Sequence, residues 1–141
     1  MPSVKLQIVE KDHAPGYLRK GRQFAEAARQ QLDLNHFEAA LLCAVHGGIS
    51  SCDAVCVALD GRRSADPNHA LAADLLESIG QNSGAFHQKA NQLRQLLALK
   101  NLIEYEDKPA RRAEAESGVA RSERLVAWAA EVLTSARLPV R

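Results

Sequence analysis

Hydrophobic and polar positions alternate with helical periodicity over most of the chain. One segment, residues 35–61, is apolar on almost every face, whereas the other segments carry their apolar residues on one stripe. A helix that is apolar all round is normally buried at the centre of a bundle, with amphipathic helices packed around it. The pattern therefore predicts an all-α fold, an up-and-down bundle of four to five helices.

Capping and turn residues mark where the central helices begin and end. Asn35 followed by Glu38 predicts a capping pair at the start of the second helix. Gly61 predicts a left-handed C-cap at its end. Asp66 followed by Pro67 predicts the N-cap and first residue of a third helix. The residues between Gly61 and Asp66 are then expected to form a connecting loop.

The remaining helices follow from their apolar stripes. The first helix places Tyr17, Gly21, Phe24, Ala28 and Leu32 on one stripe. The third helix is expected to end at residue 80, and the fourth near residue 106. The last helix should bury Leu125, Ala129, Val132 and Ala136, and the preceding stretch 110–118 is helical or frayed. The bundle is thus expected over residues 15–138.

An N-terminal arm, residues 1–14, is expected to precede the bundle. Residues 4–9 alternate between apolar and polar side chains, which indicates an edge strand or an ordered arm.

Composition supports a helical domain built from aliphatic residues. The chain has 141 residues, of which 46% are hydrophobic but only 4% aromatic. This length suffices for one domain with an ordinary core. A net charge of +1 argues against a molecule that binds polyanions with its whole surface.

Membrane insertion and metal binding are not expected. The segment 35–59 is long enough to span a bilayer, but Glu38, His46 and Asp53 would be costly there. The chain is therefore expected to be cytoplasmic, without a membrane partner. The three cysteines all lie in this segment, and Cys52 and Cys56 are spaced as i, i+4. Without a second Cys or His cluster, neither a metal site nor another cofactor is expected.

A polar stripe interrupts the apolar helix. His46, Ser50 and Asp53 fall at i, i+4 and i+7, so they share one face. Buried polar groups need partners, which leaves an internal cluster, a bound ligand or a second subunit as alternatives. Gly47 and Gly48 each cost about 1 kcal/mol against alanine in a helix. Something is therefore expected to approach this backbone closely, either a packed helix or a partner subunit.

Three passages resemble the HEPN domains (higher eukaryote and prokaryote nucleotide-binding), which are small helical bundles related to the substrate-binding domains of nucleotidyltransferases. They are the alanine-rich stretch 39–46 with Asp53-Ala54-Val55, the stretch Gly61-Arg62-Arg63-Ser64 before Asp66-Pro67-Asn68-His69, and the stretch Leu99-Lys100-Asn101-Leu102-Ile103-Glu104-Tyr105-Glu106. The resemblance spans residues 17–136 and implies a homodimer, because members of the family pair through their helices.

The resemblance also implies a candidate catalytic pair. Many HEPN proteins are metal-independent ribonucleases that use an Arg and a His a few residues apart, and Arg63 and His69 have this spacing. Histidine can serve as a general base near neutral pH, and a guanidinium can bind the phosphate in two places. In the nuclease members, however, the motif usually lies towards the last helices, where this chain has Lys100 in place of Arg and no following His. Arg62 is a candidate ligand-binding residue in the same loop.

Asn101 and Tyr105 have two interpretations. At i, i+4 they form a natural surface pair, as do Lys100 and Glu104. The resemblance instead places Asn101 and Tyr105 beside the arginine loop, where they would line a polar cleft.

The sequence therefore favours a HEPN-like binding or accessory module without catalytic activity. Its partner would be a nucleotide, RNA or a protein such as a nucleotidyltransferase, and the resemblance places it in a bacterial toxin–antitoxin or defence system. Two alternatives stay open. The first is a metal-independent endoribonuclease that uses Arg63 and His69, and the second is a structural dimerisation protein.

Overall fold

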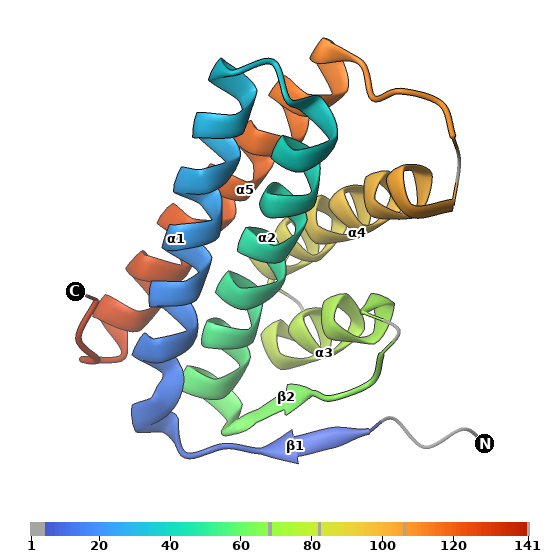
Figure 1. Ribbon diagram of the computed structural model, residues 1–141. Coiled ribbons are helices and arrows are strands. Elements are labelled where there is room, and N and C mark those ends of the chain that lie inside the picture. The colour runs from blue at the N-terminus through green and yellow to red at the C-terminus, as the bar shows by residue number, and fades with distance from the viewer. Residues whose placement is uncertain (1–4, 68, 82, 106, 141) are drawn as a thin grey trace.

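The predicted helical bundle is confirmed by the computed structural model, which describes residues 5–67, 69–81, 83–105 and 107–140 apart from the side chain of Tyr105. Within these ranges the chain forms five α-helices, a short 3-10 helix and two short strands (Figure 1). In chain order they are β1 (Leu6–Ile8), the 3-10 helix (Lys11–His13), α1 (Ala14–Asp33), α2 (Phe37–Asp60), β2 (Arg62–Ser64), α3 (Ala70–Gly80), α4 (Gly84–Tyr105) and α5 (Arg112–Ser135).

Helix α2 occupies the centre, as its apolar pattern predicts. It contacts all four other α-helices, with α1 and α5 alongside it and the α3–α4 pair beside it (Figure 1). Among the described residues, α2 is the one helix that by length and composition alone could cross a membrane. However, 78% of its most apolar window is buried inside the bundle, as in the core helix of a globular protein.

The two glycines of α2 lie where neighbouring helices come closest. A Cβ added to Gly47 would lie 2.5 Å from Ser122 Oγ of α5 and 3.3 Å from two backbone atoms of α1. A Cβ on Gly48 would lie 2.7 Å from a methyl group of Leu96 in α4. The expected close approach is therefore made by packed helices of the same chain.

Helix α1 is rotated relative to the predicted stripe. Gly21, Ala28 and Leu32 are buried as expected, but Phe24 is 37% exposed and Tyr17 is only half-buried. Their places in the core are taken by neighbours one position along the helix, Leu18 and Ala25. Small residues at 21, 25 and 28 let α1 lie close against α2, so the larger aromatic rings fall at the edge of the contact.

The predicted ends of the helices are right in part. Gly61 adopts φ 66° and donates its N–H to the Val57 carbonyl oxygen at 3.0 Å, as a left-handed C-cap does. The expected Asn35–Glu38 capping pair is wrong. The Glu38 carboxylate instead accepts a hydrogen bond from the backbone N–H of Ala110 at 2.9 Å. It thus connects the start of α2 to the start of α5.

The stretch expected to be a loop before α3 is a strand. β2 pairs antiparallel with β1, with Gln7 opposite Arg63 and Ile8 opposite Arg62. The N-terminal segment is therefore fixed against the bundle at the end of α2 (Figure 1). Helix α3 begins at Ala70, later than Asp66 and Pro67 predict.

The last two helices agree with the expected pattern in part. In α4 the side chains of Ala90, Leu93 and Leu96 are fully buried, at i, i+3 and i+6. In α5, Leu125 and Ala129 are buried as expected, but Val132 is only half-buried and Ala136 is exposed beyond the end of the helix, and Leu133 is buried instead. Helix α5 is continuous from Arg112, so the charged stretch 110–118 is largely helical rather than frayed.

Candidate functional site

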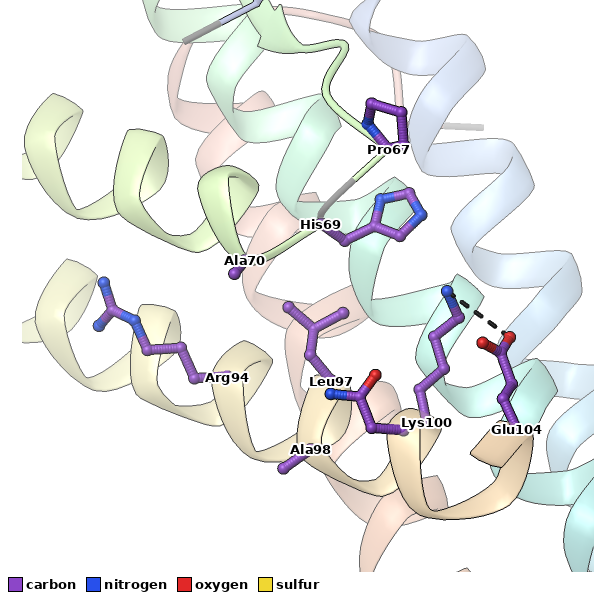
Figure 2. Close-up of a pocket in the computed structure, with 9 residues that line it drawn as sticks. Pro67, His69, Ala70, Arg94, Leu97, Ala98, Lys100 and Glu104 are labelled. Atoms are coloured by element: carbon purple, nitrogen blue, oxygen red, sulfur yellow. Dashed lines mark ion pairs between the residues drawn. The ribbon is translucent and has the colours of Figure 1, made fainter. Parts of the chain in front are cut away.

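A cavity of about 530 Å³ lies between the segment that enters α3 and the exposed face of α4 (Figure 2). This volume is in the range of pockets that bind small molecules. Its lining residues are Pro67, His69, Ala70, Arg94, Leu97, Ala98, Lys100, Asn101 and Glu104.

The periodicity of α4 explains how the cavity is lined. Positions 94, 97, 98, 101 and 104 are spaced by three or four residues, so they form one face of the helix. Leu93 and Leu96, which border this face, are buried in the core. Helix α4 thus lines the cavity with one set of side chains and packs into the core with another.

The charged side chains around the cavity are paired. Lys100 Nζ lies 3.6 Å from the Glu104 carboxylate. Arg94 donates to Asp74 at 2.7 Å and to Glu77 at 3.1 Å, so it connects α4 to α3 at one rim of the cavity. The Lys100–Glu104 surface pair expected from the i, i+4 spacing is therefore present, and Figure 2 shows it across the cavity from Arg94.

His69 lies in the cavity immediately before α3. Burial lowers the pKa of this half-buried imidazole below its ordinary value. The positive charge of Lys100 lowers the pKa further, with smaller contributions from His46 and Arg63, and Glu104 opposes them. The imidazole is therefore neutral at pH 7, which is the form that can accept a proton or a hydrogen bond.

His46 on α2 does not line the cavity, but the charges of Lys100 and Glu104 also affect its pKa. Its pKa is lowered by burial and by Lys100, and Glu104 opposes this effect. The ring packs against Phe24 of α1, with 5.4 Å between the ring centroids. Lys100 and Glu104 of α4 thus affect the pKa values of two half-buried histidines, one on α2 and one before α3.

Asp53 is buried, with 5% of its surface exposed, and its partner is Arg63 rather than His46. The distance between Asp53 Oδ2 and Arg63 Nη1 is 3.4 Å. The Arg63 guanidinium also donates to Gln7 Oε1 at 3.1 Å and lies 5.5 Å from the centre of the Tyr17 ring. Burial raises the pKa of Asp53 to about 7, although Arg63 opposes this shift. Arg63 therefore holds β2 against β1, α1 and α2.

The other predicted site residues are spread over several places. Asn101 lines the cavity together with His69. Arg62 is exposed and donates to Asp60 at 2.6 Å, whereas Ser50 is half-buried on α2, one turn after His46. Neither of these two residues lines the cavity. The side chain of Tyr105 lies outside the described part of the structure.

Sequence reasoning missed Lys100, Glu104 and Arg94 as cavity residues. The first two were interpreted as a surface pair, and that pair also forms one wall of the pocket. The signal was available in part, because Asn101 was already a candidate on the same turn of the helix. No such signal marked Arg94. Its acidic partners come from α3, so the position of Arg94 at the rim depends on how α3 packs against α4.

The groups that could hold a metal are poorly suited to it. Burial raises the pKa of Cys52 and Cys56, so both stay protonated rather than becoming metal-binding thiolates. Glu10, Asp12 and His13 bring ligand atoms within 4.8 Å of one another, but all three side chains are exposed.

Comparisons with known proteins give no family for this chain: no family model matches it, and neither a curated protein nor a solved structure matches it.

Proposed function

We propose that the protein is a non-catalytic, HEPN-like module that binds a nucleotide or the nucleotide end of an RNA in the cavity beside α4. The observation that carries this proposal is the convergence of His69, Lys100, Asn101 and Glu104 on one pocket of about 530 Å³. These side chains offer different hydrogen-bonding groups within a few turns of one another.

The polar groups of the cavity match the parts of a nucleotide. A lysine ammonium donates to phosphate oxygens, and a neutral imidazole accepts or donates according to its tautomer. The Glu104 carboxylate can accept hydrogen bonds from ribose hydroxyls, and the Asn101 amide can both donate to and accept from a base. Leu97 and Ala98 add apolar surface between them.

Binding of adenosine 5′-monophosphate, measured by calorimetry on the full chain, tests this proposal. Lys100→Ala and Asn101→Ala should each weaken the affinity by about tenfold or more, because each removes a hydrogen bond to the ligand. Lys108→Ala is the matched control, since Lys108 is exposed and lies outside the cavity lining. Equal affinities of all three variants and the wild type would contradict the proposal.

We further propose that the protein is cytoplasmic and forms a homodimer, and that its protein partner is a nucleotidyltransferase in a bacterial toxin–antitoxin or defence system. The resemblance supports this context, and exposed apolar side chains on α1 and α2 (Phe24 and Leu42, each 37% exposed) are compatible with a helical interface. Light scattering at several concentrations tests the oligomeric state. The mass of a single chain at every concentration would contradict the homodimer.

The second candidate function is a metal-independent endoribonuclease. The observation in its favour is the half-buried neutral imidazole of His69 at the cavity, on which the charge of Arg63 acts. Arg63 itself does not line the cavity and is held by Asp53 and Gln7. Incubation with RNA in EDTA decides between the two functions. Cleavage that is lost in both Arg63→Ala and His69→Ala would favour the nuclease, whereas no cleavage by the wild type favours the binding module.

A further inference from the structure

Strand β1 uses only one of its two hydrogen-bonding edges within the chain. The Val9 N–H donates to the Gly61 carbonyl oxygen before β2, and the Lys5 carbonyl oxygen accepts from the backbone after β2, both at 2.9 Å. Successive residues of a strand direct their N–H and C=O groups to opposite edges. The backbone groups of Leu6 and Ile8 therefore point away from β2.

This outer edge of β1 is not covered by another element among the described residues. β1 contacts no helix or strand other than β2, and Figure 1 shows it on the outer side of β2 at one end of the bundle. Its apolar side chains are exposed, Leu6 by 36% and Ile8 by 86%. Phe24 on α1 is only 37% exposed, and its ring already packs against His46. An open strand edge with exposed apolar side chains is a ready surface for pairing with another chain.

The edge is complementary to itself when two copies run antiparallel. With Gln7 opposite Gln7 of the second copy, the outward backbone groups of Leu6 in each copy meet those of Ile8 in the other. The same register sets the exposed side chains of Leu6 and Ile8 across from each other as two apolar cross-strand pairs. The backbone and the side chains of β1 thus favour one and the same register.

Charges at the two ends of the strand favour the antiparallel arrangement. Lys5 precedes β1 and Glu10 follows it in extended conformation, and both are exposed. An antiparallel pair brings Lys5 of one copy near Glu10 of the other at each end, whereas a parallel pair would bring like charges together. Lys11 and Asp12, which come next, carry opposite charges and add no net charge.

We propose that β1 joins two copies of this chain, pairing antiparallel about a two-fold axis at Gln7 so that the two small sheets form one sheet of four strands. The inference rests on the proposed homodimer and not on nucleotide binding, and it places the contact on β1 rather than on α1 and α2. A two-fold contact uses the edge of both copies, so it closes at the dimer. Because β1 has three residues, the dimer should be weak.

Sedimentation equilibrium of the full chain tests the association. Between about 10 μM and about 1 mM the mass should rise from one chain towards two. Ile8→Pro removes the outward N–H and the exposed side chain, but proline is tolerated where a strand's N–H faces solvent, so β1 should still pair with β2. This variant should weaken the association by about tenfold or more. The matched control is Phe24→Ser, which removes an exposed apolar side chain of α1 and should leave the association unchanged.

Disulfide formation between copies tests the register and does not depend on the proline variant. Both test variants carry Cys43→Ser, because Cys43 is the one half-buried thiol beside two buried ones. In the proposed register the two Gln7 Cα atoms lie about 4.5 Å apart, within the range of a disulfide. The two Ile8 Cα atoms lie about 8 Å apart, beyond that range. Gln7→Cys should therefore form the linked dimer about tenfold or more faster than Ile8→Cys at equal concentration.

The outcomes separate this inference from the rest of the proposed function. A dimer that persists in Ile8→Pro but is lost in Phe24→Ser overturns the inference and keeps the homodimer. Linkage of Gln7→Cys no faster than that of Ile8→Cys also overturns it. The mass of a single chain up to 1 mM overturns both the inference and the homodimer, whereas nucleotide binding in the cavity is decided by its own titration.

Discussion

Helix α2 has two faces that differ in how closely their neighbours approach. On the packed face, defined here by Gly47 and Ser51, α1 comes so close that a Cβ on Gly21 would lie 2.4 Å from Ser51 Oγ. On the polar face, defined by His46, Ser50 and Asp53, the neighbours are the side chains of Phe24, Arg63 and the α4 ion pair. The same helix therefore packs its small residues tightly against α1 on one side and carries its polar side chains on the other.

Side-chain size explains the difference. Glycine, alanine and serine let helix backbones approach closely, which fills the space with atoms and leaves no room for water. Ser51 and Ser122 are fully buried, and their hydroxyl oxygens have no hydrogen-bond partner among the described residues. This indicates that their small size, rather than their polarity, suits these positions. On the polar face the contacts are made by longer side chains, such as the rings of Phe24 and His46, whose centroids lie 5.4 Å apart.

The largest expected effect comes from adding a side chain to the packed face. Gly47→Leu should lower the free energy of unfolding by about 3 kcal/mol or more, because its Cβ alone would collide with Ser122 and approach the backbone of α1. Chemical denaturation followed by circular dichroism measures this loss. The control is Gly16→Ala on α1, where an added Cβ meets no atom within 4 Å and should be neutral or stabilising. Similar stabilities of the two variants would show that α1, α2 and α5 are not in close contact.

The next effect concerns the buried carboxyl group on the polar face. The pKa of Asp53 rises from its ordinary value of 3.8 to about 7 on folding, so the folded state binds more protons than the unfolded state between these pH values. The contribution of this group is fully present below pH 3.8 and is lost as the pH rises to about 7. Its slope is at most about 1.4 kcal/mol per pH unit.

Asp53→Asn should remove this slope, which is measured as the free energy of unfolding between pH 4 and pH 8. Relative to the wild type, the variant should therefore gain stability as the pH rises through this window. Ser50→Ala, on the same face of α2, removes no titratable group and should keep the wild-type slope. If Asp53→Asn and the wild type had parallel profiles, Asp53 would not be buried as the structure shows.

The packed face was more predictable from the sequence than the polar face. A segment that is apolar all round must be central, and glycines inside it indicate close approach, since both follow from the local sequence. The rotation of α1 by one position was not predictable, because Phe24 and Ala25 are both apolar. Which of them is buried depends on the shape of the neighbouring helix.

The partners on the polar face depend on contacts between distant segments. His46 and Asp53 share a face of α2, so the sequence suggested a link between them, but Arg63 reaches Asp53 through a strand pairing of three residues. Such short strands carry too little pattern to be recognised. The acceptor role of Glu38 likewise requires Ala110, which is 72 positions away. Asn101 lines the cavity together with His69, but the arginines beside which the resemblance placed it do not.

The smallest effect tests the rim of the packed face, where α1 and α5 are joined by an exposed ion pair. Arg29 donates from Nε to the Glu123 carboxylate at 3.1 Å and from its terminal nitrogen to the other oxygen, and both side chains are more than 40% exposed. Exposed pairs contribute only about 0.2–1 kcal/mol because water and salt screen them. Glu123→Gln should therefore cost less than 1 kcal/mol, and the cost should shrink further in 1 M salt.

A double-mutant cycle with Arg29→Gln and Glu123→Gln measures the coupling between the two side chains. A coupling energy of several kcal/mol, unaffected by salt, would mean that charge rather than the fit of small residues joins α1 to α5. That outcome would remove the contrast between the two faces of α2, since both would then depend on ion pairs. A coupling energy smaller than the loss of unfolding free energy in Gly47→Leu would leave close packing as the main source of stability on the packed face of α2.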